Sequence, residues 1–182
     1  MKAALLMLVL AAGAAALLIG GLATATQQRI AQNQVDYDLQ QLQRAIKNLS
    51  MTLIQPTPDS THFELWSDNL RQGFLLPLET TQGYNGTIRA WLAVDQAGTI
   101  TAVSTRSHQE TPGIGDIINA GAPWLDQFYD RDVRYHQFRS KRLGGDFDHV
   151  TGATITSRAY IEMVGQGLKA HAHRFMTGDA DE

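Results

Sequence analysis

The residues best suited to chemistry form a hydroxyl-rich run directly before a predicted helix. From Asp148 to Ser157 the chain reads DHVTGATITS. After this run the apolar residues recur at spacings of three and four, as on one buried helix face: Tyr160, Met163, Val164, Leu168, Ala172 and Phe175. The first turn of a helix carries unpaired N–H groups and the positive end of the dipole, which favour an anion. The pattern therefore predicts a phosphate-binding site with the hydroxyl of Thr154 at its centre.

Two features of this run concern how the helix starts and how near a ligand can come. Thr156 or Ser157 is expected to be the N-cap, because a hydroxyl can accept from a free amide of the first turn. Gly152 and Ala153 bring no large side chain, so the backbone there can approach a bulky ligand. Taken alone, the run is also typical of an ordinary loop and helix cap.

The segment from Asp148 to Thr154, Asp-x-x-Thr-Gly-Ala-Thr, resembles the flavinylation motif of the FMN-binding domain family. In that family a flavin transferase links FMN through its phosphate to the hydroxyl of the motif's last threonine, which corresponds to Thr154 here. The resemblance implies FMN as the cofactor, covalently held as a phosphoester. It also implies that Asp148 orients Thr154 or contacts the transferase, and that the phosphate and ribityl contacts come from Thr151, Gly152, Ala153 and Thr156.

A second segment, reading HQETPGIGD from His108 to Asp116, is a loop stiffened by Pro112 and loosened by two glycines. By itself it is an ordinary loop that connects a strand to a short helix, which Asp116 could cap. It also resembles a segment of the same family, as found in the G subunits of the Rnf (Rsx) electron-transport complex. The resemblance extends over about residues 83–175 and the N-terminal apolar run. It implies that His108, Glu110 and Thr111 lie beside the flavin ring, or else that the loop docks another subunit.

The chain opens with a long apolar segment. Residues 3–25 are uncharged and 23 residues long, enough to span a bilayer, which needs about 20. A cleaved signal peptide ending at Ala23-Thr24-Ala25 is the alternative, but its apolar core would be shorter. Because Lys2 precedes the segment, we expect a single-pass protein of the bacterial inner membrane, with residues 1–25 as the anchor and the C-terminal domain in the periplasm.

Residues 26–55 are predicted to form an amphipathic helix and linker. The apolar residues recur at spacings of four and three, at Val35, Leu39, Leu42, Ile46, Leu49 and Leu53. Pro56 and Pro58 then stop the pattern. The apolar stripe suits packing on the chain's own domain or on a partner helix, and it is short for a coiled coil.

The fold class predicted for residues 56–182 is α+β, a compact mixed domain with an antiparallel hairpin. Short strands are expected at 63–66 and 74–78. Residues 88–94 alternate as a half-buried strand, the run DQAG at 95–98 makes a turn, and residues 99–105 return as the second strand of the hairpin.

Composition removes several classes of function. The formal net charge is -3 and there is no basic run, so nucleic acid is not an expected partner. The absence of cysteine excludes disulfides and thiolate-bound iron–sulfur clusters. Six histidines are present, but His171 and His173 do not share a helix face, and no metal site is predicted. The modest basic cluster of residues 131–142 is interpreted as a solvated face.

The resulting interpretation is an electron-carrying flavoprotein subunit, not a complete enzyme alone. The resemblance implies a membrane complex that couples electron flow between ferredoxin and NADH to ion translocation, with the other membrane subunits, a flavin transferase and membrane lipid as partners. One alternative is the C-type subunit of Na+-translocating NADH:quinone reductase, which is usually longer. The other is a non-catalytic, membrane-anchored interaction module without flavin.

Overall fold

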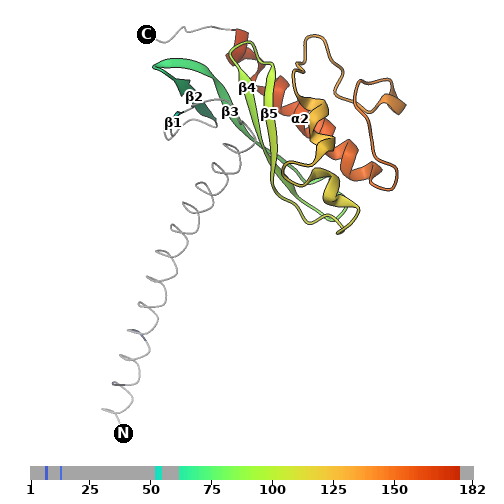
Figure 1. Ribbon diagram of the computed structural model, residues 1–182. Helices are drawn as coiled ribbons and strands as arrows, with labels where there is room; N and C mark the ends of the chain where they lie inside the picture. The colour runs from blue at the N-terminus through green and yellow to red at the C-terminus, as the bar shows by residue number, and fades with distance from the viewer. Residues whose placement is uncertain (1–6, 8–12, 14–51, 55–61, 177–182) are drawn as a thin grey trace. The chain divides into compact units, whose positions relative to one another are not determined.

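The computed structural model describes residues 7, 13, 52–54 and 62–176, with 52–54 and 173–176 described by their backbone only (Figure 1). They belong almost entirely to the second of two compact units, residues 41–182. Apart from residues 7 and 13, the predicted anchor lies outside the described residues, as do the linker after residue 55 and most of the predicted amphipathic helix. Within those residues, no helix is both long and apolar enough to cross a bilayer.

A five-stranded antiparallel sheet forms the centre of the domain, and each strand pairs with its neighbour along the chain. Two of the connections are tight turns, between β2 and β3 and between β4 and β5. Asp68 and Asn69 both adopt positive φ between two strands, as a two-residue hairpin loop of matching twist requires. Gly98 also has a positive φ, and the Asp95 carboxylate accepts from the amide of Thr99 across that turn. The strands are β1 (Thr52–Ile54), β2 (Phe63–Ser67), β3 (Leu70–Thr80), β4 (Ile88–Asp95) and β5 (Ile100–Ser107).

The helix predicted within residues 26–55 is wrong at its last described residues, because Thr52–Ile54 is strand β1. These three residues pair antiparallel with Glu64 to Trp66 of β2. Two of the three are β-branched, which favours a strand over a helix. The helical pattern rested there on Leu53 alone, and one apolar residue cannot distinguish the two periods.

Helix α2 (Thr154–Met176) lies along one face of the sheet and completes the core (Figure 1). Its predicted apolar face is confirmed where side chains are described, since Tyr160, Met163, Val164 and Leu168 are all buried. Gly167 allows a close approach, because a Cβ there would lie 2.3 Å from the Leu78 side chain on β3. The helix therefore sits directly against the sheet.

The hairpin of β4 and β5 is confirmed, but its first strand is not half-buried as predicted. Trp91 and Ala93, on the face opposite Leu92, are buried as well. The Trp91 ring meets Phe63 edge-on at 5.4 Å between centroids, and the Arg106 guanidinium lies 4.5 Å above it. The residues that alternate with the apolar set include Trp91 and Ala93, which are themselves compatible with burial. The alternation therefore did not show that the second face is exposed to water.

Three short 3₁₀ helices, η1 (Gly115–Ile118), η2 (Pro123–Phe128) and η3 (Lys141–Leu143), lie in the connection from β5 to α2. Aromatic side chains join this connection to the helix. The Phe128 ring packs against those of Phe147 and Tyr160, and the Tyr160 hydroxyl hydrogen-bonds Thr105 at 2.9 Å. Burial raises the pKa of Tyr160 well above its usual value, although the hydrogen bond with Thr105 opposes the shift. The phenol is therefore held neutral inside the core.

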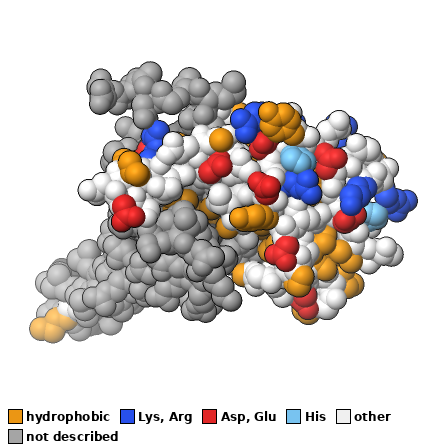
Figure 2. Space-filling view, turned by 45° about the horizontal axis from the view of Figure 1, so that its top comes forward, with side chains coloured by type: hydrophobic (Ala, Val, Ile, Leu, Met, Phe, Trp, Pro, Cys, Tyr) orange, Lys and Arg blue, Asp and Glu red, His pale blue; other side chains and the backbone are white. Residues whose placement is uncertain are grey.

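The basic cluster of residues 131–142 is partly neutralised. Arg134 pairs with Asp132 at 3.1 Å, and Lys141 pairs with Asp148 at 2.8 Å. On the face that Figure 2 draws, basic and acidic side chains are interspersed and do not form one large patch of a single sign.

Candidate functional site

Thr154 is the first residue of α2 and its side chain is exposed. The prediction that Thr156 or Ser157 caps the helix is wrong, because both lie inside its first turn. Their hydroxyls have tertiary partners instead. The Thr156 hydroxyl donates to the Glu110 carboxylate, and the Ser157 hydroxyl accepts from the amide of Val150 at 3.1 Å. The helix can start earlier because those two hydroxyls are engaged elsewhere.

The first turn of α2 leaves three backbone donors without an acceptor among the described residues. The first amide with a helical partner is that of Ser157, which donates to the carbonyl of Ala153 at 2.9 Å. No partner within the described fold accepts from the amides of Thr154, Ile155 and Thr156. Free amides at a helix N-terminus form a seat for an anion. The unpaired amides expected at this helix start are thus present beside the Thr154 hydroxyl, where they could donate to an anion.

Gly152 shapes the loop through its conformation. Its φ is +90°, a region that other L-residues rarely adopt, and a Cβ there would meet nothing within 4 Å. The glycine is therefore required by backbone geometry, and not by a close neighbour. Ala153, which follows it, is buried, and its amide donates to the carbonyl of Val150 at 3.0 Å.

Asp148 holds the start of the loop through its backbone. Its amide donates to the side-chain oxygen of Gln127 at 2.7 Å, and its carbonyl accepts from the Trp124 indole at 3.0 Å. Its exposed carboxylate pairs with Lys141. In the described part of the chain no hydrogen bond joins that carboxylate to Thr154. An orienting bond from Asp148 to Thr154, expected from the resemblance, is therefore not formed here.

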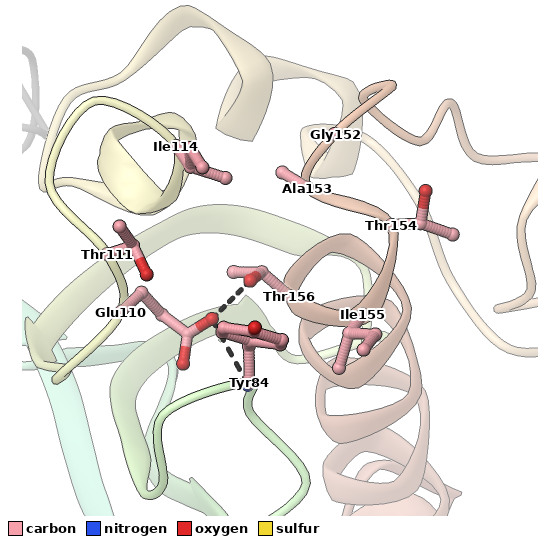
Figure 3. A pocket seen from close by; sticks show the side chains of 9 residues that line it. All are labelled: Tyr84, Glu110, Thr111, Ile114, Gly152, Ala153, Thr154, Ile155 and Thr156. Carbon is pink, nitrogen blue, oxygen red and sulfur yellow. Dashed lines mark hydrogen bonds between the residues drawn. The ribbon is translucent and has the colours of Figure 1, made fainter.

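A hollow of about 440 Å³ opens between the start of α2, the loop after β5 and the turn before β4 (Figure 3). Its lining residues are Tyr84, Glu110, Thr111, Ile114, Gly152, Ala153, Thr154, Ile155 and Thr156. Tyr84, Ile114 and Ile155 are large, apolar and 64%, 47% and 42% exposed. Thr156 points towards Glu110, whereas Thr154 points away from it at the edge of the hollow (Figure 3). Both sequence motifs therefore meet at one site.

Glu110 joins the elements that form this hollow, and only 6% of the residue is exposed. Its carboxylate accepts from the amides of Tyr84 at 3.2 Å and Asn85 at 3.0 Å, and from the Thr156 hydroxyl. Gly115 packs against it so closely that an added Cβ would lie 2.2 Å from the Glu110 Cβ. Gly115 thus leaves the space that the Glu110 side chain occupies.

The other two polar residues of the second motif have different places. Thr111 lines the hollow and accepts from the Asn85 side chain at 3.0 Å. His108 does not line it. One ring nitrogen of His108 accepts from the amide of Glu110 at 3.2 Å, so the other donates to Asn119 at 2.7 Å. His108 therefore fastens the loop to the end of η1, while Thr111 is available to a ligand.

Sequence reasoning did not single out Tyr84, Ile114 or Ile155 as site residues. Tyr84 stands in a Gly-Tyr-Asn-Gly turn and Ile114 stands between two glycines of the second motif. Binding residues concentrate on loops held by a rigid scaffold, so a large apolar residue in a glycine-rich loop was the available signal. Ile155 carried no such signal, because it fits a helix equally well.

Comparisons with known proteins show which family the chain resembles. Residues 83–169 match the family model of the FMN-binding domain. The G subunit of the ion-translocating oxidoreductase complex of Vibrio vulnificus is 32% identical over 157 residues, covering 70% of this chain and 74% of that protein. The corresponding protein of Shewanella amazonensis is 44% identical over 99 residues, covering 51% of this chain and 46% of that protein. The match thus spans about half of the Shewanella relative.

A crystal structure of NqrC from Shewanella oneidensis shares the fold. Its TM-score is 0.52, its sequence identity is 22%, and the match covers 69% of this chain and 68% of that one.

Proposed function

Because the chain belongs to the family of G subunits of the ion-translocating oxidoreductase complex, we propose that it is the electron-carrying flavoprotein subunit of such a complex. FMN is held as a phosphoester on the Thr154 hydroxyl, and a flavin transferase makes that bond. The other membrane subunits are its partners, and electron flow between ferredoxin and NADH drives ion translocation. The protein is not a complete enzyme alone.

The observation that carries this proposal is the pairing of an exposed hydroxyl with three free amides. Thr154 stands at the edge of the hollow, and the amides of residues 154–156 have no acceptor within the described fold. A phosphate esterified to that hydroxyl would lie within reach of those donors, and the helix dipole would favour its charge. Thr151, Gly152 and Thr156 flank this position and would contact the phosphate and ribityl chain.

The hollow also suits a planar ring system. Its volume of about 440 Å³ lies within the usual range of small-molecule sites. Tyr84, Ile114 and Ile155 offer apolar surface at its rim, and Thr111 offers a hydroxyl. Bound FMN supplies the electron-transfer chemistry, while these residues orient it and keep water from one side of it. His108 acts indirectly, by fixing the loop that carries Thr111.

Two alternatives differ in their support. The likeness to NqrC is one of fold, whereas the relatives that are similar in sequence are G subunits. A non-catalytic module would need neither the free amides nor the open hollow. The loop from His108 to Asp116 can also contact another protein of the complex, since Ile114 and Asp116 are exposed.

The location of the protein is likewise proposed. Residues 1–25 anchor it in the bacterial inner membrane with a cytoplasmic N-terminus, and the flavin domain is periplasmic. Protease added to spheroplasts should digest the domain and leave a tag placed before Met1 intact. N-terminal sequencing that begins at Thr26 would show that a signal peptide had been removed.

The flavin attachment is tested by the mass of the intact protein made with and without a flavin transferase. We expect flavin absorbance that survives denaturation, a mass increase matching one FMN phosphoester, and a modified peptide containing Thr154. The Thr154→Ala variant should lose all three signals, whereas Thr81→Ala, an exposed threonine outside the hollow, should keep them. Colourless wild-type protein from cells that hold the transferase, or attachment at Thr151 or Thr156, would contradict the proposal.

A further inference from the structure

Glu110 is held by hydrogen bonds from the protein on both oxygens of its carboxylate. Its two oxygens receive three donors from the protein, the amides of Tyr84 and Asn85 and the hydroxyl of Thr156. Amides can only donate, and the Thr156 hydroxyl donates here, so the carboxyl serves as an acceptor on both oxygens. This pattern suits the ionised carboxylate, and places a full negative charge on a residue that is 6% exposed.

Among the described residues, no lysine, arginine or histidine side chain forms an ion pair with this carboxylate. Glu110 is the only charged residue of the nine that line the hollow, and none of its bonds comes from lysine or arginine. The amides of Tyr84 and Asn85 bond the carboxylate but carry no net charge. The field of the buried carboxylate therefore reaches whatever occupies the hollow, with little screening by water.

We propose that Glu110 is a fixed negative charge that lowers the reduction potential of the flavin in this hollow. The proposal rests on the function proposed above, in which FMN on Thr154 places its ring here. Electrons added to the ring bring negative charge towards Glu110, and the reduced form is disfavoured relative to the oxidised form. Glu110 is assigned an effect through its charge, because Tyr84, Asn85 and Thr156 fix both of its oxygens in place.

The test is a redox titration of the full-length, flavin-loaded protein in detergent, comparing wild type with Glu110→Gln and Glu110→Asp. Glutamine keeps the size and loses the charge, whereas aspartate keeps the charge and shortens the side chain. Two unit charges about 7 Å apart at an effective dielectric of about 20 shift an equilibrium by more than tenfold. We therefore expect Glu110→Gln to favour reduction at least tenfold, which raises a two-electron potential by about 30 mV.

Glu110→Asp separates charge from packing. It should stay within about threefold of wild type, or about 15 mV, even if both variants melt at lower temperature. An equal rise in both variants would assign the effect to lost packing and overturn the proposal, as would an unchanged or lowered potential in Glu110→Gln.

A second pair of variants applies if Glu110→Gln does not fold. Ile114 lies at the exposed rim of the same hollow, so Ile114→Lys adds a positive charge there and Ile114→Gln is its neutral control. The lysine variant should have the higher potential, and equal potentials would overturn the proposal. Wild-type protein without covalent flavin would instead contradict the proposed function, because that result concerns Thr154 and not Glu110.

Discussion

The hydrogen bond from Thr156 to Glu110 links α2 to the loop after β5, and Thr156→Val removes it while keeping the shape of the side chain. Both residues are buried, at 2% and 6% exposure. A hydrogen bond to a charged group contributes about 1.5–3 kcal/mol. The same oxygen of Glu110 also accepts from the amide of Tyr84 at 3.2 Å, so the carboxylate keeps a partner on it. We therefore expect the low end, a loss of about 1.5–2 kcal/mol.

The measurement is thermal and urea unfolding of the full-length protein, made without a flavin transferase and purified in detergent. For a domain of about one hundred residues, 1 kcal/mol corresponds to roughly 4 °C in Tm, so Thr156→Val should melt about 6–8 °C below wild type. The control is Thr154→Val, the same change two residues away at an exposed position without a hydrogen-bond partner in the described fold. It should stay within about 0.5 kcal/mol of wild type.

Thr156→Ser completes the comparison, because it restores the hydroxyl at the cost of one methyl group. It should recover most of the lost stability. If Thr156→Val melted together with Thr154→Val, the link between α2 and Glu110 would carry no stability, and the reasoning from burial and charge would be refuted.

Three further outcomes follow from other contacts. Burial would raise the pKa of Asp132, but bonds from the Arg134 side chain and from the amides of Arg134 and Tyr135 outweigh it and lower the pKa below 3.8. The stability from this group is present above pH 3.8 and lost as pH falls through the lowered pKa, so Asp132→Asn should lose stability at neutral pH and approach wild type in acid unfolding scans. Burial raises the pKa of Tyr160 above 10.0, so wild type should lose stability as pH rises above 10. Tyr160→Phe should remove that alkaline loss and cost about 1–2 kcal/mol at neutral pH in urea unfolding, because Thr105 loses its partner. Gly152→Ala should cost about 1 kcal/mol in the same assay, since its φ is +90° and no clash adds to the strain.

The elements predicted correctly are those whose signal is local. The apolar face of α2, from Tyr160 to Leu168, repeats with the helical period, and burial on one side follows directly from that period. The hairpin of β4 and β5 is likewise set by its turn, where Asp95 and Gly98 supply the needed hydrogen bonds and positive φ. Predicting unpaired amides near Thr154 required only that a helix start after a glycine-containing loop.

The errors arose where distant segments compete for the same residues. Residues 52–54 are a strand because they pair with β2, and the β-branched Thr52 and Ile54 alone were too weak a signal to predict that pairing. Thr156 is a residue type that often caps helices, but its hydroxyl donates to the carboxylate of Glu110, 46 residues earlier in the chain. Which partner a hydroxyl takes depends on what folding brings near it, and spacing along the chain does not contain that information.

The sequence by itself thus determined that a helix follows the hydroxyl-rich run, that the preceding loop contains glycine, and that the central hairpin pairs, because each depends on backbone preferences over a few residues. Tertiary structure alone decided that Glu110 is buried, that His108 fastens its loop instead of facing the hollow, and that Tyr84, Ile114 and Ile155 share one rim. Burial of a charge and the convergence of three loops depend on packing between segments. Those contacts exist only when the sheet and α2 have come together.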